Sequence, residues 1–323
     1  MLPRELWLQF DCHSHNETIT AHDVSNHAST RPFRFGTPLF FLTRRELLSS
    51  LLLMRYLPCF MVDIHCHILP GLDDGSESLQ MSLEMAESAI SDGITHVIAT
   101  PHASNQFEFI PDLVRARRDE IQERLGNRLQ IATGCDFHFS FENIESVRRD
   151  QPRFTLNQKS YLLVEFGNFS IPPALDPALH QLQLQGLRPI ITHPERNPLI
   201  RARFERLWQW MHLGCFVQVT AQSFTGGFGE TARQAANTLL DAGAIHFIAS
   251  DAHNTTTRPL RLKEAFAFVA SRKGEEVAKA LFQDNPLAAL EGRPLPYLPE
   301  PAELSSKRNL RGGSQPKKRF WFF

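Results

Sequence analysis

The sequence predicts an α/β fold with parallel strands, arranged either as a barrel or as an open sheet. From Val62 onward, short apolar runs alternate with longer amphipathic stretches, which is the pattern of repeated β/α units. The chain has 323 residues, of which 42% are hydrophobic and 21% charged, so it is long enough for one α/β domain of about 250 residues.

Buried strands are expected where short apolar runs end in glycine or polar residues. The expected strands are residues 62–68, 95–100, 129–135, 160–166, 187–193, 215–220 and 246–250. Between most of them lie stretches with helical periodicity: residues 78–92, 112–125, 173–185, 203–213, 231–242 and 258–273. The first helix has a capping residue at each end, Ser78 before it and Gly93 after it.

One folded domain is expected, spanning residues 61–293. Residues 1–60 show no sustained hydrophobic period, so we expect a poorly structured N-terminal extension, or a translation start assigned upstream of Met61. Residues 294–323 become proline-rich and then basic, which predicts a disordered tail. Its closing aromatic residues allow at most a peripheral contact with anionic lipid.

Charge and cysteine content narrow the classes of partner and compartment. The formal net charge is −1, which provides no broad basic surface for nucleic acid. The five cysteines are scattered without a CxxC pair, so neither a disulfide framework nor a zinc ribbon is expected. No apolar run reaches the roughly 18 residues that a membrane span needs. A cytoplasmic protein is therefore expected.

Histidines and carboxylates gather on one face of the first strand and at the ends of later ones. Asp63, His65 and His67 alternate along the strand, so their side chains point to the same side. Two imidazoles this close repel each other when both are protonated, and a metal ion between them removes that conflict. Alone, this spacing is also compatible with buried core histidines.

The same arrangement recurs where other strands end. Because the carboxyl ends of parallel strands converge on one edge of a fold, these polar residues predict one crowded pocket. Imidazole and carboxylate ligands without thiolate suit Mn, Fe or Zn, and their number predicts two or three ions. The residues at later strand ends are His102, Asp136 with His138, Glu165, His193 with Glu195 and Arg196, and Asp251 with His253.

Five motifs occur in order along the chain: DIHCHILPGLDDG (63–75), IATPH (98–102), LLVEF (162–166), THPERN (192–197) and ASDAHNTTTRP (249–259). Together they resemble the polymerase and histidinol phosphatase (PHP) family. Within it, the chain is most similar to the manganese-dependent tyrosine phosphatases encoded with bacterial capsule and exopolysaccharide genes. The resemblance covers about residues 61–293 and implies a distorted seven-stranded (β/α) barrel with a trinuclear metal centre.

The resemblance also implies roles for individual residues. Arg196 and Arg258 are the implied phosphate-binding residues. Asp136 occupies a position that is more commonly Glu in the family, where it bridges two metals, so the shorter side chain puts the metal stoichiometry in question and makes His138 an alternative ligand. The implied metal ligands are His65, His67, Asp74, His102, Asp136, Glu165, His193, Asp251 and His253.

Such a site suits the hydrolysis of a phosphomonoester. Divalent ions lower the pKa of bound water, so a metal-bound hydroxide is the expected nucleophile. Arginine provides a planar fork that matches two phosphate oxygens. A phenolate leaving group, with a pKa near 10, needs little protonation. Glu195 and Asp74 are candidates for protonating the leaving group, and neither is assigned this role.

Other phosphatase and nucleotide chemistries lack their motifs. None of the cysteines has an arginine six residues later, which excludes a cysteine-dependent phosphatase, and no GxxxxGK[ST] loop occurs. The TGGFGE segment (225–230) matches no dinucleotide motif and is expected to be a flexible loop near the pocket.

The leading hypothesis is a metal-dependent phosphatase acting on a phosphotyrosine protein, with the tail of a bacterial tyrosine kinase as the candidate substrate. A small-molecule phosphoesterase of the same fold, such as a histidinol-phosphate phosphatase, is the nearest alternative. A catalytically weak regulator that binds a tyrosine kinase is an alternative of another class.

Overall fold

The computed structural model describes residues 60–169, 171 and 175–299, whose strands form two all-parallel sheets. The three-stranded sheet has the order β1 (Met61–Cys66), β2 (Ile94–Ala99), β4 (Gln130–Thr133). The six-stranded sheet has the order β3 (His102–Ala103), β5 (Asp136–His138), β6 (Tyr161–Glu165), β7 (Arg188–Thr192), β8 (Phe216–Thr220), β9 (Phe247–Ala249). The fold is therefore α/β with parallel strands, as predicted.

The two sheets are joined on both sides. On one side the chain itself connects them, since β2 leads through Thr100 and Pro101 into β3, and β4 leads through Gly134 and Cys135 into β5; the Asp136 N–H donates to the Pro101 carbonyl (3.1 Å) at this junction. On the other side the Asp251 N–H, just after β9, donates to the carbonyl of His65 in β1 (2.8 Å). The predicted strand at 129–135 is shorter in the structure, where β4 covers Gln130–Thr133, and a separate strand that was not predicted, β5, begins at Asp136 after Gly134 and Cys135.

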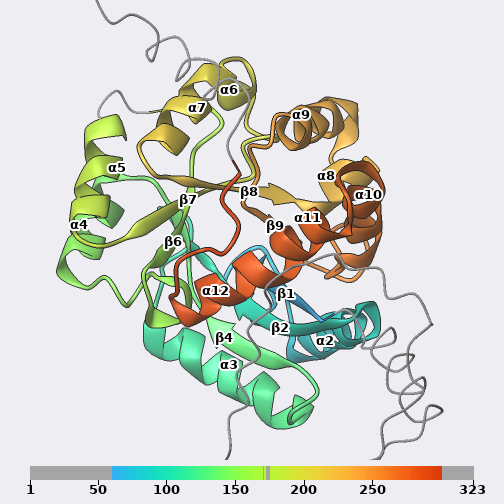
Figure 1. Cartoon of the computed structure of the whole chain (residues 1–323). Helices are drawn as coiled ribbons and strands as arrows, with labels where there is room; N and C mark the ends of the chain where they lie inside the picture. The colour runs from blue at the N-terminus through green and yellow to red at the C-terminus, as the bar shows by residue number, and fades with distance from the viewer. Residues whose placement is uncertain (1–59, 170, 172–174, 300–323) are drawn as a thin grey trace, which may run out of the picture. The chain divides into compact units, whose positions relative to one another are not determined.

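Helices lie around the strands in the view of Figure 1. The predicted capping of α2 (Leu79–Asp92) is confirmed: Ser78 Oγ accepts a hydrogen bond from the Met81 N–H, and Gly93 adopts a left-handed φ of 92°. The other helices are α3 (Pro111–Leu125), α4 (Phe141–Arg149), α5 (Leu175–Leu184), α6 (Pro198–Arg201), α7 (Phe204–His212), α8 (Ala221–Thr225), α9 (Gly229–Asp241), α10 (Lys263–Lys273), α11 (Glu275–Lys279) and α12 (Asn285–Glu291), with a 3₁₀ turn at Leu156–Gln158 and a π-helical turn at Ala280–Asp284.

The prediction of a helix over residues 258–273 is wrong at its start, because α10 begins at Lys263. Asn254 Oδ1 accepts hydrogen bonds from the N–H groups of Thr257 (2.8 Å) and Arg258 (3.0 Å), which closes a tight turn. The Arg258 carbonyl accepts the His253 N–H (2.9 Å), so this carbonyl is used in the turn and not in a helix. The loop holds Arg258 beside the last pair of predicted ligands.

Most strand residues are buried, as expected for parallel strands covered by helices, and β4 with its exposed Gln130 is the exception. In β1, Val62 and Ile64 belong to one apolar cluster, whereas Met61 and Cys66 belong to another. The predicted extension at 1–60 lies outside the described residues except for Phe60. Of the predicted tail, residues 294–299 are described, and Leu295 is buried there.

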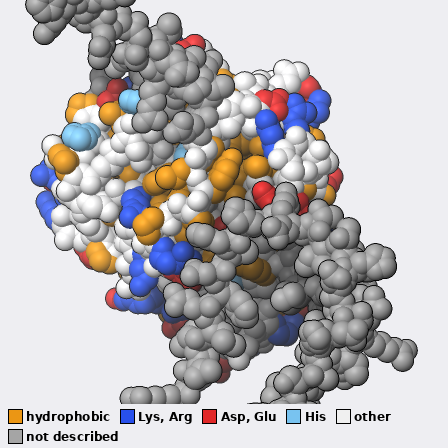
Figure 2. Space-filling model, in the orientation of Figure 1, with side chains coloured by type: hydrophobic (Ala, Val, Ile, Leu, Met, Phe, Trp, Pro, Cys, Tyr) orange, Lys and Arg blue, Asp and Glu red, His pale blue; other side chains and the backbone are white. Residues whose placement is uncertain are grey.

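The surface carries charges of both signs. On the face shown in Figure 2, Lys and Arg side chains lie in several separate groups, some with Asp or Glu beside them. Within the part of the chain that is described, no helix has both the length and the apolar character needed to cross a bilayer.

A buried histidine outside the predicted ligand set generates a prediction about stability and pH. His246 precedes β9, and its Nδ1 accepts a hydrogen bond from the Val217 N–H (3.2 Å). Burial lowers the pKa of His246 from 6.5 to about 3. Between these two values the unfolded chain binds a proton that the folded chain does not, so the free energy of unfolding falls as the pH is lowered.

We expect His246 to account for about 2 kcal/mol of the loss in unfolding free energy between pH 7.5 and pH 5. In His246→Asn, Oδ1 accepts the same hydrogen bond and does not titrate, so the variant should lose about 2 kcal/mol less over this range. Urea unfolding of both proteins at a series of pH values measures the difference, in which the titration of all other groups cancels. Parallel curves for the two proteins would contradict the assignment.

Candidate metal centre

The structure brings all nine predicted metal ligands together at the ends of the strands. They form four overlapping groups, and within each group one ligand atom from every member lies within 4.8 Å of the others. The groups share members, so the nine residues make one cluster. The four groups are His67, Asp74, His102 and His253; His65, His67 and Asp136; His65, His193 and Asp251; and His102, Asp136 and Glu165.

His65 in β1 and His67 just after it are each oriented by a partner outside the predicted ligand set. His65 Nδ1 donates to Gln218 Oε1 (3.0 Å), and His67 Nδ1 donates to Asp73 Oδ2 (2.6 Å). These bonds turn the two Nε2 atoms toward each other, 3.3 Å apart. When both rings are neutral, each Nε2 carries a lone pair, so a proton or a metal ion is needed between them.

Asp73 and Gln218 were not identified from the sequence. Asp73 also accepts hydrogen bonds from the N–H groups of Gly75 (3.0 Å) and His102 (3.0 Å), so it joins the glycine turn to β3. Burial alone would raise the pKa of Asp73, but the neighbouring His67 outweighs it and lowers that pKa to about 2. Carboxylates behind ligand histidines are common in metal sites. The Asp73–Asp74 pair was the available signal, but spacing does not tell which carboxylate faces the metal.

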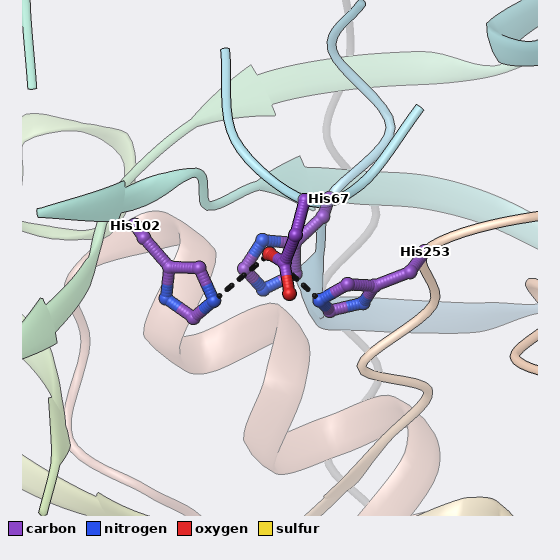
Figure 3. A group of neighbouring side chains, drawn as sticks. His67, His102 and His253 are labelled. Atoms are coloured by element: carbon purple, nitrogen blue, oxygen red, sulfur yellow. Dashed lines mark ion pairs between the residues drawn. The ribbon is translucent and has the colours of Figure 1, made fainter. Parts of the chain in front are cut away.

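Asp74 lies between two histidines from opposite ends of the domain sequence. Its Oδ1 is 3.3 Å from His102 Nε2 and 3.4 Å from His253 Nε2. Figure 3 shows His102 and His253 on either side of His67, with these two ion pairs dashed. The His67 ring centroid is 4.4 Å from that of His102 and 4.0 Å from that of His253.

Asp136 takes the position for which the sequence left His138 as an alternative. Asp136 Oδ2 is 3.1 Å from His102 Nδ1 and 3.5 Å from His65 Nε2, and Asp136 belongs to two of the four groups. His138 belongs to none of them, and its Nδ1 is 3.7 Å from Glu165 Oε2. The side chain of Asp136, although shorter than that of Glu, therefore still brings a ligand atom into two of the four groups.

Buried polar atoms without hydrogen-bond partners show that the residues fit bound cations. Within the described chain, both carboxylate oxygens of Asp136 are buried and lack such a partner, as do His102 Nδ1 and His253 Nε2. Their close contacts, such as Asp136 Oδ2 with His102 Nδ1 at 3.1 Å, do not have the geometry of hydrogen bonds, and buried polar atoms without hydrogen bonds are costly and rare in folded proteins. All these atoms are typical ligands of divalent transition metals, so the cluster has the donor set that such ions require.

Two of the predicted ligands have strained backbones. His193 has a φ of 34° and Asp251 a φ of 51°, both in the left-handed region that non-glycine residues rarely adopt. Each residue follows closely on a strand, and the sharp change of direction turns its side chain into the cluster. Strain of this kind is typical of functional sites and is maintained by surrounding structure. Here the Asp251 N–H bonds to His65, and the His193 N–H bonds to the Gln218 carbonyl (2.8 Å).

The histidines have widely different proton affinities. Burial alone would lower the pKa values of His65 and His102, but nearby carboxylates outweigh it and raise them to about 9 and about 11. Burial and the adjacent His67 instead lower the pKa of His253 to about 4. Cations that bind this cluster must therefore displace protons from His65 and His102.

The two predicted phosphate-binding arginines share one carboxylate oxygen. Arg196 and Arg258 both pair with Asp251 Oδ2, the latter at 2.6 Å through Nη2. Arg258 Nε is buried and has no hydrogen-bond partner among the described residues, which leaves a donor for an anion. Beside the cluster lies a cavity of about 260 Å³, lined by Glu165, Asn168, His193, Arg196, Arg201, Phe228 and Ala232.

Glu195 is a buried structural carboxylate and does not line this cavity. Its Oε1 accepts hydrogen bonds from the Thr220 N–H (3.0 Å) and from Ser223 Oγ (2.7 Å), so it holds the turn between β8 and α8. Because Glu195 does not line the cavity, its position does not support the predicted role in protonating the leaving group. Arg201, which the sequence did not single out, lines the cavity and donates to the Glu195 carbonyl (3.1 Å).

The glycine turn before α2 generates a prediction about metal affinity. A Cβ at Gly75 would lie 2.3 Å from the His67 carbonyl oxygen and 2.4 Å from His67 Cβ, so Gly75→Ala must displace His67 or the turn that carries Asp73 and Asp74. We expect Mn²⁺ affinity to fall by roughly 10- to 100-fold, the usual effect of disturbing the residues that orient metal ligands. Calorimetric titration of metal-stripped protein measures it.

Gly71→Ala is the matched control in the same turn. Gly71 has a φ of 67° and nothing within 4 Å of an added Cβ, so this change strains the backbone without touching His67. Equal Mn²⁺ affinities for the two variants would show that the position of His67 does not govern binding.

Comparisons with known proteins agree with this site. The family model for capsular polysaccharide synthesis, CpsB/CapC, matches residues 61–291. Tyrosine-protein phosphatase YwqE of Bacillus subtilis is 35% identical over 231 residues, covering 70% of this chain and 91% of that protein. Tyrosine-protein phosphatase CpsB of Streptococcus pneumoniae is 27% identical over 235 residues, covering 70% and 96%.

A solved structure gives the same relationship. It belongs to the crystal structures of YwqE from Bacillus subtilis and CpsB from Streptococcus pneumoniae, described as unique metal-dependent tyrosine phosphatases. It superposes with a TM-score of 0.70 at 34% sequence identity and covers 75% of this chain and 99% of its own.

Proposed function

Because the chain belongs to the capsular polysaccharide synthesis family CpsB/CapC, we propose that it is a metal-dependent phosphatase that hydrolyses phosphotyrosine in proteins. The relatives YwqE and CpsB carry that activity in their names, and the solved relatives are described as metal-dependent. The observation that carries the proposal is the convergence of nine histidines and carboxylates beside two arginines. The catalytic domain is residues 61–293.

The proposal includes two or three divalent cations, with manganese as the first candidate and iron or zinc as alternatives. One ion cannot use all nine side chains, and the four overlapping groups offer several positions. When bound, divalent cations acidify water and neutralise charge on the phosphoryl group. Their proposed ligands are His65, His67, Asp74, His102, Asp136, Glu165, His193, Asp251 and His253.

We also propose that the strands close into the distorted seven-stranded barrel. In this arrangement β2 with β3 and β4 with β5 each act as one interrupted strand, supported by the Asp136–Pro101 hydrogen bond. The Asp251–His65 hydrogen bond and the parallel bridge between Cys66 and Ala252 support a junction between the last strand and the first.

The chain's own groups position the phosphate. The guanidinium groups of Arg196 and Arg258 offer planar donors to the phosphate oxygens, and Asp251 holds both of them in place. Asp73 and Gln218 keep the rings of His67 and His65 in fixed orientations. Departure of a phenolate needs no dedicated acid, since the pKa of a phenol is near 10.

The proposed substrate is a phosphotyrosine protein, with the tail of a bacterial tyrosine kinase as the candidate. The proposed compartment is the cytoplasm, which is supported by the free thiols of the buried Cys66, Cys135 and Cys215.

We expect the protein loaded with Mn²⁺ to release phosphate from a phosphotyrosine peptide, and chelation to abolish the reaction. Arg258→Lys keeps the charge but loses the planar fork, so kcat/KM should fall roughly 10- to 100-fold, equivalent to about 1.5–3 kcal/mol. Arg261→Lys is the matched control, because Arg261 is exposed and bonds to Ser88 on α2. Failure to release phosphate from any aryl phosphate with Mn, Fe or Zn would refute the proposal.

The substrate class is tested by comparing kcat/KM for the phosphotyrosine peptide with kcat/KM for histidinol phosphate. We expect the peptide to be the better substrate, and a preference for histidinol phosphate would identify a small-molecule phosphoesterase instead. His65→Ala should remove activity in vitro and function in the cell. Retained cellular function with no activity would favour a regulator that binds a kinase.

A further inference from the structure

The loop between α8 and α9 places an aromatic ring against both phosphate-binding arginines. Phe228 is half-buried in this loop, and its ring centroid lies 4.2 Å from Arg196 Cζ and 5.7 Å from Arg258 Cζ. Gly226 and Gly229 flank it with φ values of 89° and 81°, a conformation that favours glycine. The backbone therefore turns sharply on both sides of Phe228.

We propose that Phe228 contacts the ring of an aryl phosphate and makes the site select aryl over alkyl phosphoesters. The inference rests on the proposed function and adds to it the residue that recognises the leaving group.

The position of the arginines leads to this assignment. Phe228 packs against both guanidinium groups, so a phosphate bound by the two arginines would lie next to its ring. An aryl group esterified to that phosphate would then be close enough to contact Phe228. The quadrupoles of two aromatic rings favour offset or edge-to-face contacts at short range.

The adjacent cavity has room for an aryl ring. Its volume is about 260 Å³, whereas an apolar cavity of about 150 Å³ in another protein binds benzene. Among the described residues that line it, Phe228 is the one phenylalanine, tyrosine or tryptophan. The remaining lining is mostly polar or charged, with Glu165, Asn168 and Arg201 among its members. An alkyl group would gain less from this wall, because it lacks a ring to pair with Phe228.

A second role for Phe228 must be separated from ring recognition. Its cation–π contact with Arg196 could act only to orient that guanidinium. Orientation of the arginine would strengthen the binding of every phosphate equally. Ring recognition instead changes the ratio between aryl and alkyl ligands.

The experiment compares phenylphosphonate with methylphosphonate, two ligands that the enzyme cannot hydrolyse, by calorimetric titration of the Mn²⁺-loaded protein. We expect wild type to prefer phenylphosphonate, and Phe228→Leu to reduce that preference about 3- to 10-fold, as expected for the loss of one aromatic pair. Phe228→Trp should retain the preference. Phe141→Leu is the matched control, because Phe141 is 76% exposed and has no ring contact within the described structure.

The outcomes are distinguishable from those that test the phosphatase activity. No preference in wild type, or equal weakening of both ligands in Phe228→Leu, overturns the role of Phe228 whether or not phosphotyrosine is hydrolysed. Loss of preference in Phe228→Leu with retention in Phe228→Trp supports that role even if no phosphate is released. Far-ultraviolet circular dichroism shows whether Phe228→Leu folds. If it does not, Phe228→Trp decides: loss of the preference for phenylphosphonate overturns the role of Phe228, and retained preference supports it.

Discussion

The carboxylate and backbone of Asp251 are the point on which the cluster, the proposed phosphate pocket and the junction between the two sheets all depend. One oxygen lies 3.3 Å from His65 Nε2, and the other pairs with Arg196 and Arg258. Its backbone N–H bonds to the carbonyl of His65 across the two sheets. Asp251 fills all three roles with a strained left-handed φ of 51°, and the surrounding hydrogen bonds and ion pairs maintain this conformation.

The electrostatic balance of the site follows from the same crowding. Burial alone would raise the pKa values of the Asp136 and Asp251 carboxyl groups. Neighbouring histidines and arginines stabilise both carboxylates as anions and outweigh burial, so both pKa values lie well below their ordinary range. Asp73 and Gln218 already fix the rings of His67 and His65, so the proposed cations would meet these two ligands in fixed orientations. Preorganisation of this kind reduces the rearrangement that binding requires.

Beside this cluster the proposed substrate pocket is built from loops. Arg196 lies in the turn after β7, Arg258 in the loop after β9 and Phe228 in the loop between α8 and α9. Arg196 and Arg258 both pair with Asp251, and Phe228 packs against both arginines. Strand ends thus provide most of the proposed metal ligands, and loops provide the wall of the proposed pocket, a division common in parallel α/β folds.

The sequence by itself determined the features that depend on local geometry. The cap of α2 by Ser78 and Gly93 depends only on neighbouring residues, and alternation in a strand places side chains of like parity on one face. Since parallel strands all end on one edge, polar residues at those ends could be expected to meet, and the structure brings them together.

Only the tertiary structure decided the features that depend on contacts between distant segments. It separated Asp73 from Asp74, placed Asp136 rather than His138 in the cluster, and brought Gln218 to His65. It also started α10 five residues later than predicted, because Asn254 and Arg258 close a turn whose bonds the periodicity of the sequence does not show. In each case several side chains had suitable chemistry, and the choice among them depended on distances that the packing of the strands sets.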